Sequence, residues 1–323
     1  MAKKIGLVGI YFPGAYDTLH ENVPEGFELV DALSPEAYGN LADCEYLISR
    51  LDIDPDIINH TPHVKFWQRW GAGFDHVDLK AWGERGIPIA TCPGVNSGIV
   101  AELAIMLMLA GYRNLLQINR QLLEGHFPRT EYFGRSFMIK GKTVGVLGLG
   151  HIGKKVAALV TAFGANVIYY DILRQPDQEE KYGYRFVDFD TLLEQSDIFT
   201  VHCPLNEETR GMISFEQFKK MKPSAMLINT ARGPIVDEAA MIDALTTGKI
   251  ATAGLDTYEH EPLPKDHPLL KLDNVVASAH AGGNTKDNDI NMVNYVYHNI
   301  VAFDRGEPLN TPGDIVNGEF LKK

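Results

Sequence analysis

The feature that most constrains this chain is a glycine-rich turn between an apolar strand-like run and a helix-like segment. The run Lys142–Leu147 leads directly into three glycines with the spacing G-x-G-x-x-G. Gly148 would allow a tight turn, Gly150 a close approach of the backbone to phosphate groups, and Gly153 close packing of the helix on the strand. The helix N-terminus would then face the anion. The sequence therefore predicts that a dinucleotide pyrophosphate binds at this turn.

A carboxylate stands where such a site usually binds the adenosine ribose. The strand-like run Ala165–Tyr170 ends in Asp171, eighteen residues after Gly153. A carboxylate at this point accepts hydrogen bonds from the ribose and would repel a 2′-phosphate, so NAD is expected rather than NADP. Arg174 follows three residues later and could soften that preference. The sequence leaves open whether it does.

Length, charge and cysteine usage narrow the class of protein. The 323 residues suffice for two domains of ordinary size. A net charge of −12, with no Lys/Arg-rich tract, argues against nucleic acid or an anionic membrane as the main partner. Cys44, Cys92 and Cys203 lie far apart without a C-x-x-C motif, which indicates a reducing cytoplasm. The apolar segment Ile99–Ala110 contains a charge and is too short to cross a bilayer.

Strand-like runs alternate with helix-like segments, which favours two doubly wound parallel sheets in an α/β protein. In the first half the expected strands are Ile5–Ile10, Phe27–Val30, Tyr46–Ser49, Val64–Trp70 and Ile87–Thr91. In the second half they are Thr143–Leu147, Asn166–Tyr170, Ile198–Val201, Ala225–Asn229 and Val275–Ala277. Long helices are expected from about Ile99 to Leu123 and from about Asn288 to Ile300.

The segment Pro93–Gly98 breaks the pattern and marks a hinge. The last helix could fold back on the first domain and make that domain discontinuous. We therefore expect a flavodoxin-like substrate domain from residues 1–98 and 289–323. Residues 99–288 would form a Rossmann dinucleotide-binding domain, with a cleft between the two.

Three polar clusters follow expected strands, where an open parallel sheet binds its ligands. They are Ile228–Glu238, Gly254–Pro262 and Ser278–Gly283. Arg232 could grip a carboxylate with two hydrogen bonds, although a lone arginine is equally often in a surface salt bridge. His280, beside two glycines, could move protons near neutral pH, especially with a carboxylate on its far ring nitrogen. Taken alone, it could equally be a core histidine.

Together these motifs resemble the D-isomer-specific 2-hydroxyacid dehydrogenase family over nearly the whole chain. The matching segments, besides the glycine turn and Asp171, are Gly71–Asp78, Val100–Ala104, Val201–Thr209, Asn229–Gly233, Gly254–Asp256, Glu261–Pro262 and His280–Gly283.

The resemblance implies an NAD-dependent enzyme that transfers hydride reversibly between NADH and C2 of a 2-oxo acid, forming a D-2-hydroxy acid. Arg232 would bind the substrate carboxylate and polarise the 2-oxo group. His280 would donate the proton, and Glu261 would hold His280 and raise its pKa. Glu259 is a rival for that role, but the family pattern places the carboxylate directly before the proline.

The resemblance also assigns residues that contact the two ligands. Backbone amides around Gly71, Ala72 and Gly73 would help Arg232 and His280 to bind the substrate. Asp256 would hold the nicotinamide carboxamide. The other implied cofactor contacts are Val100, Gly148, Gly150, His151, Ile152, Gly153, Asp171, Ile172, His202, Cys203, Pro204, Thr209, Thr230, Ala231, Arg232, His280 and Gly282.

Several alternatives stay open. A homodimer through the long helix near Val100 is what the family implies, but burial also explains its apolar stripe. Phe66, Trp67 and Trp70 suggest an apolar pocket and so an aliphatic or aromatic 2-oxo acid, although such aromatics lie more often in a core than in a pocket. Lys65 and Arg69 could instead suit a phosphorylated acid. A rival of another class is a dinucleotide-sensing binding protein like the corepressors built on this fold. No metal site is expected, because the pairs His60–His63 and His202–Cys203 lack further ligands nearby in sequence.

Overall fold

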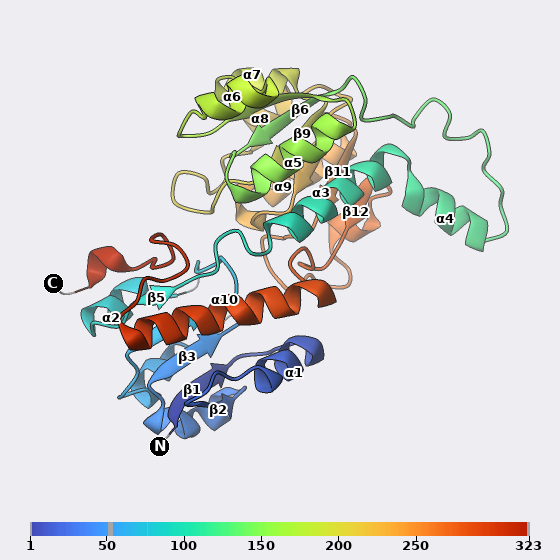
Figure 1. Cartoon of the computed structure of the whole chain (residues 1–323). Coiled ribbons are helices and arrows are strands. Elements are labelled where there is room, and N and C mark those ends of the chain that lie inside the picture. Colours follow the sequence, from blue (N-terminus) through green and yellow to red (C-terminus); the bar gives the residue numbers. More distant parts are fainter. Residues whose placement is uncertain (1, 51–53, 76, 322–323) are drawn as a thin grey trace. The chain divides into compact units, whose positions relative to one another are not determined.

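The computed structural model describes residues 2–50, 54–75 and 77–321, and the chain divides into two compact units (Figure 1). Unit 1 comprises Met1–Asn96 with Asn284–Lys323, and unit 2 comprises Ser97–Gly283. The sequence predicted the divisions between the two domains after residues 98 and 288. These lie two and five residues further along the chain than the divisions between the two units, after Asn96 and Gly283. Each unit contains one parallel sheet, so the expected α/β fold class is confirmed. His76, in the motif Gly71–Asp78, lies outside the described residues.

Unit 1 is built on a five-stranded parallel sheet of order β2-β1-β3-β4-β5. Its strands are β1 (Lys3–Val8), β2 (Phe27–Ala32), β3 (Tyr46–Ser49), β4 (Phe66–Arg69) and β5 (Ile89–Ala90). Its helices are α1 (Pro13–Glu21), α2 (Leu79–Glu84) and α10 (Lys286–Arg305), with 3-10 turns η1 (Pro35–Asp43), η2 (Pro55–His60) and η5 (Gly318–Phe320).

The C-terminal segment completes unit 1. Met292, Val293 and Val296 of α10 pack into one buried cluster with Ile5 and Ile48 of the sheet. After α10 the chain returns to β5, where Ala90 and Ile315 form an antiparallel bridge and the Thr91 N–H donates to the Asp314 carbonyl at 2.9 Å. The first domain is therefore discontinuous in sequence.

Unit 2 is built on a seven-stranded parallel sheet of order β12-β11-β10-β9-β6-β7-β8. Its strands are β6 (Thr143–Leu147), β7 (Asn166–Tyr170), β8 (Arg185–Phe186), β9 (Ile198–Val201), β10 (Met226–Asn229), β11 (Thr252–Leu255) and β12 (Val275–Ala277). The five strands expected from the sequence omitted β8 and β11. The run Thr-Ala-Gly-Leu of β11 has little strand propensity, and its position between β10 and β12 buries it all the same.

Helices cover both faces of this second sheet. On one face pack α3 (Ser97–Tyr112) and α5 (His151–Ala162), whose apolar side chains join those of β6 and β10. On the other face lie α7 (Phe189–Gln195), α8 (Phe215–Lys220) and α9 (Glu238–Thr246). The remaining elements are α4 (Leu115–Leu123), α6 (Pro176–Tyr182), η3 (Gly233–Ile235) and η4 (Pro268–Lys271).

The prediction of one long helix from about Ile99 to Leu123 is wrong, because the segment forms two helices. Asn114 adopts a left-handed conformation with φ of 51°, which ends α3 and starts α4 at a bend of 63°. Asparagine tolerates this conformation better than most residues, so the chain can turn there without a glycine or proline. Within the described ranges, no single helix is long and apolar enough to cross a bilayer, although the bent pair α3 and α4 together would be.

Candidate active site

The predicted cofactor and catalytic residues of unit 2 follow the carboxyl ends of its strands, with the exception of Val100 in α3. This is the edge at which parallel sheets bind ligands. After β6 come Gly148, Gly150, His151, Ile152 and Gly153; after β7, Asp171 and Ile172; after β9, His202, Cys203, Pro204 and Thr209; after β10, Thr230, Ala231 and Arg232; after β11, Asp256 and Glu261; and after β12, His280 and Gly282.

The glycine turn has the geometry that a dinucleotide needs. Gly148 has a φ of +90°, and a Cβ there would lie 2.7 Å from the Cys203 backbone nitrogen. A Cβ on Gly153 would collide with the carbonyl oxygen of Gly148, so α5 can approach β6 only with glycine at this position. A Cβ on Gly150, in contrast, would meet no atom within 4 Å. The turn is packed on the protein side and open at Gly150, which fits a pyrophosphate there.

Asp171 is fixed beside this turn by two backbone hydrogen bonds. Its Oδ2 accepts from the Leu149 N–H at 2.7 Å, and its Oδ1 accepts from the Leu173 N–H at 3.1 Å. Arg174 binds Glu179 through two hydrogen bonds of 2.9 and 2.8 Å. This contact lowers the pKa of Glu179 to about 2. Arg174 is thus engaged by a carboxylate of its own segment.

Of the six buried side-chain polar atoms that lack a hydrogen-bond partner in the described residues, three follow strands of unit 2. These three are Nδ1 of His202 and the hydroxyl oxygens of Thr230 and Thr257, after β9, β10 and β11. Burial lowers the pKa of His202 to about 3, so its ring is neutral. Because a buried polar atom without a partner is costly, these atoms indicate polar groups of a bound ligand. Thr257 was missed from the sequence, where only its place after Asp256 could have suggested it.

Asp256 organises the loop that carries His280. Its Oδ1 accepts hydrogen bonds from the Ser278 hydroxyl at 2.6 Å and the Ala281 N–H at 2.9 Å. Its Oδ2 accepts from the Gly282 N–H at 2.9 Å, and its carbonyl oxygen accepts from the His280 N–H at 2.8 Å. The residue is only 2% exposed. The hydrogen bonds of this carboxylate therefore serve loop positioning, a role that the sequence did not suggest.

His280 and Glu261 form a close pair. The Nδ1 of His280 lies 2.7 Å from Oε2 of Glu261, and since a carboxylate only accepts, Nδ1 carries the hydrogen. Oε1 of Glu261 accepts from the Tyr258 N–H at 3.0 Å. With Nδ1 committed to Glu261, Nε2 is the ring atom that would exchange a proton with a substrate. Glu259, the rival carboxylate, does not take this place.

The His280 backbone is in a left-handed conformation with φ of 50°. A non-glycine residue holds this conformation only where its surroundings impose it, and here the hydrogen bond from the His280 N–H to the Asp256 carbonyl does so.

The pKa of Glu261 reflects opposing effects, of which burial alone would raise it. The hydrogen bonds from His280 and the Tyr258 N–H, and the charges of His280 and Arg232, outweigh burial and lower this pKa. Glu261 is therefore ionised near neutral pH.

Arg232 is presented by a well-ordered turn after β10. The buried Asn229 holds this turn, because its Nδ2 donates to the Arg232 carbonyl at 2.9 Å and its Oδ1 accepts from the Ala231 N–H at 3.0 Å. A Cβ on Gly233 would collide with the backbone of Tyr258, so the Arg232 turn and the segment leading to Glu261 touch directly. Unit 2 thus brings an arginine, a carboxylate and a histidine together.

Tyr258 connects Glu261 with the loop that carries His280. This role was not predicted from the sequence. The N–H of Tyr258 binds Glu261, and its buried hydroxyl donates to the Ser278 carbonyl at 2.7 Å, two residues before His280. Burial, with the charges of nearby carboxylates, raises the pKa of Tyr258 to about 12, so the hydroxyl stays a donor.

The predicted substrate residues Gly71, Ala72 and Gly73 lie in unit 1, directly after β4. Gly71 has a φ of +119°, and its carbonyl accepts from the Cys92 N–H at 2.8 Å. The carbonyl of Gly73 lies 3.4 Å from Nε of Arg69. The backbone after β4 is therefore held in a defined turn.

The sequence left open whether Phe66 and Trp67 line a pocket or belong to the core, and the structure places both side chains in the core of unit 1. Phe66 is fully buried and stacks on Phe303 with ring centroids 4.5 Å apart. Trp67 donates to the Ser49 hydroxyl at 2.6 Å. A central strand of a parallel sheet is covered on both faces, so its aromatic residues need not line a pocket.

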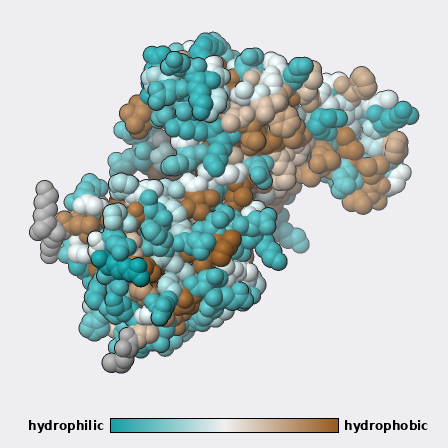
Figure 2. Space-filling view, viewed as in Figure 1, coloured by the Kyte–Doolittle hydropathy of each residue, from teal (hydrophilic) through white to brown (hydrophobic). Residues whose placement is uncertain are grey.

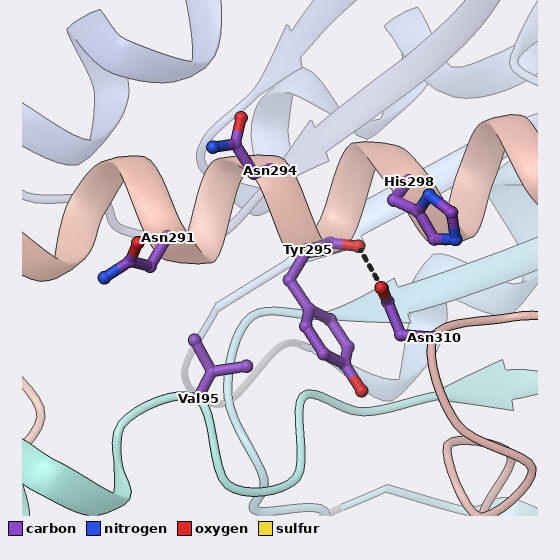
Figure 3. Close-up of a pocket in the computed structure, with 6 residues that line it drawn as sticks. All are labelled: Val95, Asn291, Asn294, Tyr295, His298 and Asn310. Carbon is purple, nitrogen blue, oxygen red and sulfur yellow. Dashed lines mark hydrogen bonds between the residues drawn. The ribbon is translucent and has the colours of Figure 1, made fainter.

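A separate hollow of about 520 Å³ lies on α10 of unit 1 (Figure 3). Its lining residues are Val95, Asn291, Asn294, Tyr295, His298 and Asn310. This lining contains no guanidinium or ammonium group that would bind a carboxylate, and no carboxylate to pair with His298, so it lacks the combination that unit 2 has. In the described part of the chain, no group of three or more His, Cys, Asp or Glu residues could hold a metal ion.

Comparison with known proteins gives consistent matches. A family model described as the NAD binding domain of D-isomer specific 2-hydroxyacid dehydrogenase matches residues 105–282. A glyoxylate reductase of Korarchaeum cryptofilum is 38% identical over 284 residues, which cover 87% of this chain and 85% of the relative. A D-3-phosphoglycerate dehydrogenase of Archaeoglobus fulgidus is 42% identical over 261 residues, which cover 81% of this chain but 49% of the relative. The NAD-complexed structure of a D-isomer specific 2-hydroxyacid dehydrogenase from Lactobacillus delbrueckii ssp. bulgaricus is similar with a TM-score of 0.78 and 28% identity, covering 97% of this chain and 100% of that one.

Proposed function

This chain belongs to the D-isomer-specific 2-hydroxyacid dehydrogenase family, and we propose that it reduces a small 2-oxo acid at C2 with His280 as the proton donor. It is an NAD-dependent oxidoreductase that acts on the CH–OH group of D-2-hydroxy acids. The observation that carries the proposal is the 2.7 Å contact between His280 and Glu261, with the charge of Arg232 acting on the same carboxylate.

The residues of unit 2 divide the chemistry between them. NADH, when bound to the loops after β6, β7 and β9, supplies the hydride. Arg232 would bind the substrate carboxylate and polarise the 2-oxo group. Nε2 of His280 would give its proton to the forming alkoxide, and Glu261 would stabilise the imidazolium and fix its orientation. In the oxidation of a 2-hydroxy acid, the neutral imidazole would take the proton back.

Among 2-oxo acids, we propose glyoxylate as the first substrate to test, because the relatives at this level of identity include glyoxylate reductases. The test follows absorbance at 340 nm with NADH and glyoxylate, pyruvate, hydroxypyruvate, 2-oxoisocaproate or phenylpyruvate. NADH oxidation with at least one of them is expected. If NADH binds but none of the five acids is reduced, the dinucleotide-sensing binding protein is the better interpretation.

Replacing Asp171 by asparagine is expected to weaken discrimination against NADPH by about tenfold, which corresponds to about 1.4 kcal/mol. The substitution removes the charge that repels a 2′-phosphate but keeps an oxygen that can accept from the Leu149 N–H. The measurement compares kcat/KM for NADH and NADPH. Glu179→Gln, which weakens the hold on Arg174, should shift the ratio in the same direction. Equal use of both cofactors by the parent protein would contradict the proposed role of Asp171.

We also propose that the protein is a homodimer, and that the arm formed by α4 and the chain up to residue 138 contributes to the contact. The arm extends from the body of unit 2 in Figure 1, and Figure 2 shows hydrophobic side chains gathered on it. Its exposed apolar residues are Leu115, Leu116, Leu122, Leu123, Phe127, Phe133, Phe137 and Met138. An apolar surface of this kind marks an interaction site. A second copy of the chain is the occupant that the family implies.

The double variant Leu123→Asp/Phe133→Asp is expected to raise the dimer dissociation constant by at least about 100-fold, because burying one such side chain contributes about 1.5–3 kcal/mol. Light scattering coupled to gel filtration measures the change. The two side chains are 81% and 87% exposed. Phe215→Asp on α8, at a residue that is 43% exposed outside the arm, is the control and should leave the mass unchanged. A double variant with the parental mass would exclude the arm from the interface.

A further inference from the structure

The Glu261 loop, residues 259–267, is mostly exposed although it carries a carboxylate that must be held in place. Glu259, His260, Glu261 and Pro262 are exposed, as are residues 264–266. An exposed loop with few buried contacts samples many conformations. A carboxylate on such a loop would leave its partner histidine unless the loop were tied down elsewhere.

Both ends of this loop are tied to one carboxylate, that of Glu238. Oε1 of Glu238 lies 2.9 Å from Nε2 of His267, at the end of the loop. Oε2 accepts from the Glu259 N–H at 3.4 Å, at the start of the loop. The side chains of Glu238 and His267 are only 14% and 15% exposed, whereas those of a surface pair such as Lys220–Asp190 are 38% and 57% exposed. The low exposure protects this contact from competing water.

The position of Glu238 is fixed by the capped N-terminus of α9. Glu238 is the first residue of α9, whose N-terminus is capped by Asp237 through a 2.9 Å bond from the Ala240 N–H. A negative charge in the first turn of a helix is favourable. The turn that precedes α9 carries Arg232, and its Gly233 touches the backbone of Tyr258. One segment therefore presents Arg232 and, six residues later, the carboxylate that holds the Glu261 loop.

The ring of His267 is oriented to donate a hydrogen bond to Glu238. Its Nδ1 accepts from the Leu269 N–H at 3.4 Å, which caps η4. Because that nitrogen accepts, the hydrogen of the neutral ring is on Nε2, from which it is donated to Glu238. A single tautomer thus satisfies both contacts.

From this arrangement we propose that Glu238 is a positioning residue. Together with His267 it fixes the Glu261 loop and thereby keeps Glu261 against His280. The effect on turnover rests on the function proposed above. The placement of Glu261 can be tested without turnover.

The test compares three variants of the full chain. Glu238→Ala removes both contacts. His267→Asn places an oxygen where Nδ1 caps η4 but loses the donor to Glu238. His267→Gln places an amide N–H near the position of Nε2 and so keeps that donor. The readouts are kcat and KM for the 2-oxo acid, the NADH dissociation constant from fluorescence, the thermal midpoint, and the imidazole ¹⁵N spectrum of His280.

Glu238→Ala and His267→Asn are expected to lower kcat by about tenfold, since a displacement of about 1 Å in a catalytic group can cost up to 10²-fold. The NADH dissociation constant should change by less than about twofold, because the loop lies outside the predicted cofactor contacts. His267→Gln should restore kcat to within about threefold of the parent. The same two damaging variants should alter the Nδ1 signal of His280, and His267→Gln should preserve it.

Parental kcat and a parental His280 spectrum in Glu238→Ala, with only a lower thermal midpoint, would overturn the proposal and leave Glu238 a purely structural residue. If Glu238→Ala does not fold, the comparison of His267→Asn with His267→Gln decides, and equal behaviour of these two overturns it. If the parent reduces no 2-oxo acid, the proposed function fails while the His280 spectrum still tests the placement of Glu261.

Discussion

Replacing His280 by alanine is expected to cut the reduction of a 2-oxo acid by at least about 100-fold while leaving NADH binding nearly intact. The expectation rests on Nδ1, which is held by Glu261 at 2.7 Å and leaves Nε2 as the proton donor. The glycine turn and Asp171, which would hold the cofactor, do not depend on this side chain. Rates at 340 nm and NADH fluorescence titration measure the two effects separately.

Two further variants make this result specific. His280→Asn lacks a proton donor of suitable acidity but tolerates the left-handed backbone, so it should be as inactive as alanine with less disturbance of the loop. His260→Ala removes an exposed histidine of the Glu261 loop and should keep parental rates. Undiminished turnover in both His280 variants would show that another group donates the proton.

The carboxylate of Glu261 should affect the pH dependence of kcat/KM for reduction. Glu261 has a lowered pKa, so its charge is present above that pKa and is lost as the pH falls through it. The ionised Glu261 accepts the hydrogen bond that holds Nδ1 of His280, and protonation of the carboxylate at low pH removes that acceptor. In Glu261→Gln, which has no carboxylate to protonate, the fall of kcat/KM for reduction on the acid side should therefore be absent. An unchanged profile would mean that the contact does not control the donor.

The glycine turn and the strand-end clusters could be predicted from the sequence because their chemistry is local. Glycine spacing specifies a turn directly, and polar residues after buried strands must meet at one edge of a parallel sheet. The pairing of His280 with Glu261 rather than Glu259 followed only from the family pattern. Periodicity alone does not distinguish two carboxylates that are two residues apart in an exposed loop.

Other features depend on contacts between distant segments and were therefore missed or left open. Asn114 is no obvious helix breaker, and its left-handed conformation is accompanied by hydrogen bonds from its Nδ2 to the Arg135 carbonyl and the Ser136 hydroxyl. The sequence left open whether the aromatic residues of β4 line a pocket or a core, and the place of this strand inside the sheet buries Phe66 and Trp67 in the core. The hydrogen bonds of Asp256 join it to a loop more than twenty residues away, and no local pattern encodes them.

Replacing Asp256 by asparagine is expected to lower kcat by about 100-fold and the free energy of unfolding by about 1–3 kcal/mol, the cost of leaving a buried group unsatisfied. An amide offers one accepting oxygen in place of two. If that oxygen takes the place of Oδ1, the NH₂ group faces the Gly282 N–H. If it takes the place of Oδ2, the NH₂ group faces the Ala281 N–H. In either orientation two donors oppose each other, and the loop that holds His280 must move.

Ser278→Ala is the matched control, because it removes one hydrogen bond of this carboxylate and leaves both backbone donors satisfied. It should reduce kcat by about fivefold, which corresponds to about 1 kcal/mol for the loss of a single hydrogen bond. Steady-state kinetics, urea unfolding and NADH titration together separate the two roles of Asp256. Loss of kcat with a nearly parental NADH dissociation constant identifies loop positioning. A weakened affinity for NADH with parental kcat and stability would instead assign this carboxylate to the nicotinamide carboxamide, and the loop would then owe its conformation to Tyr258 and the strand ends alone.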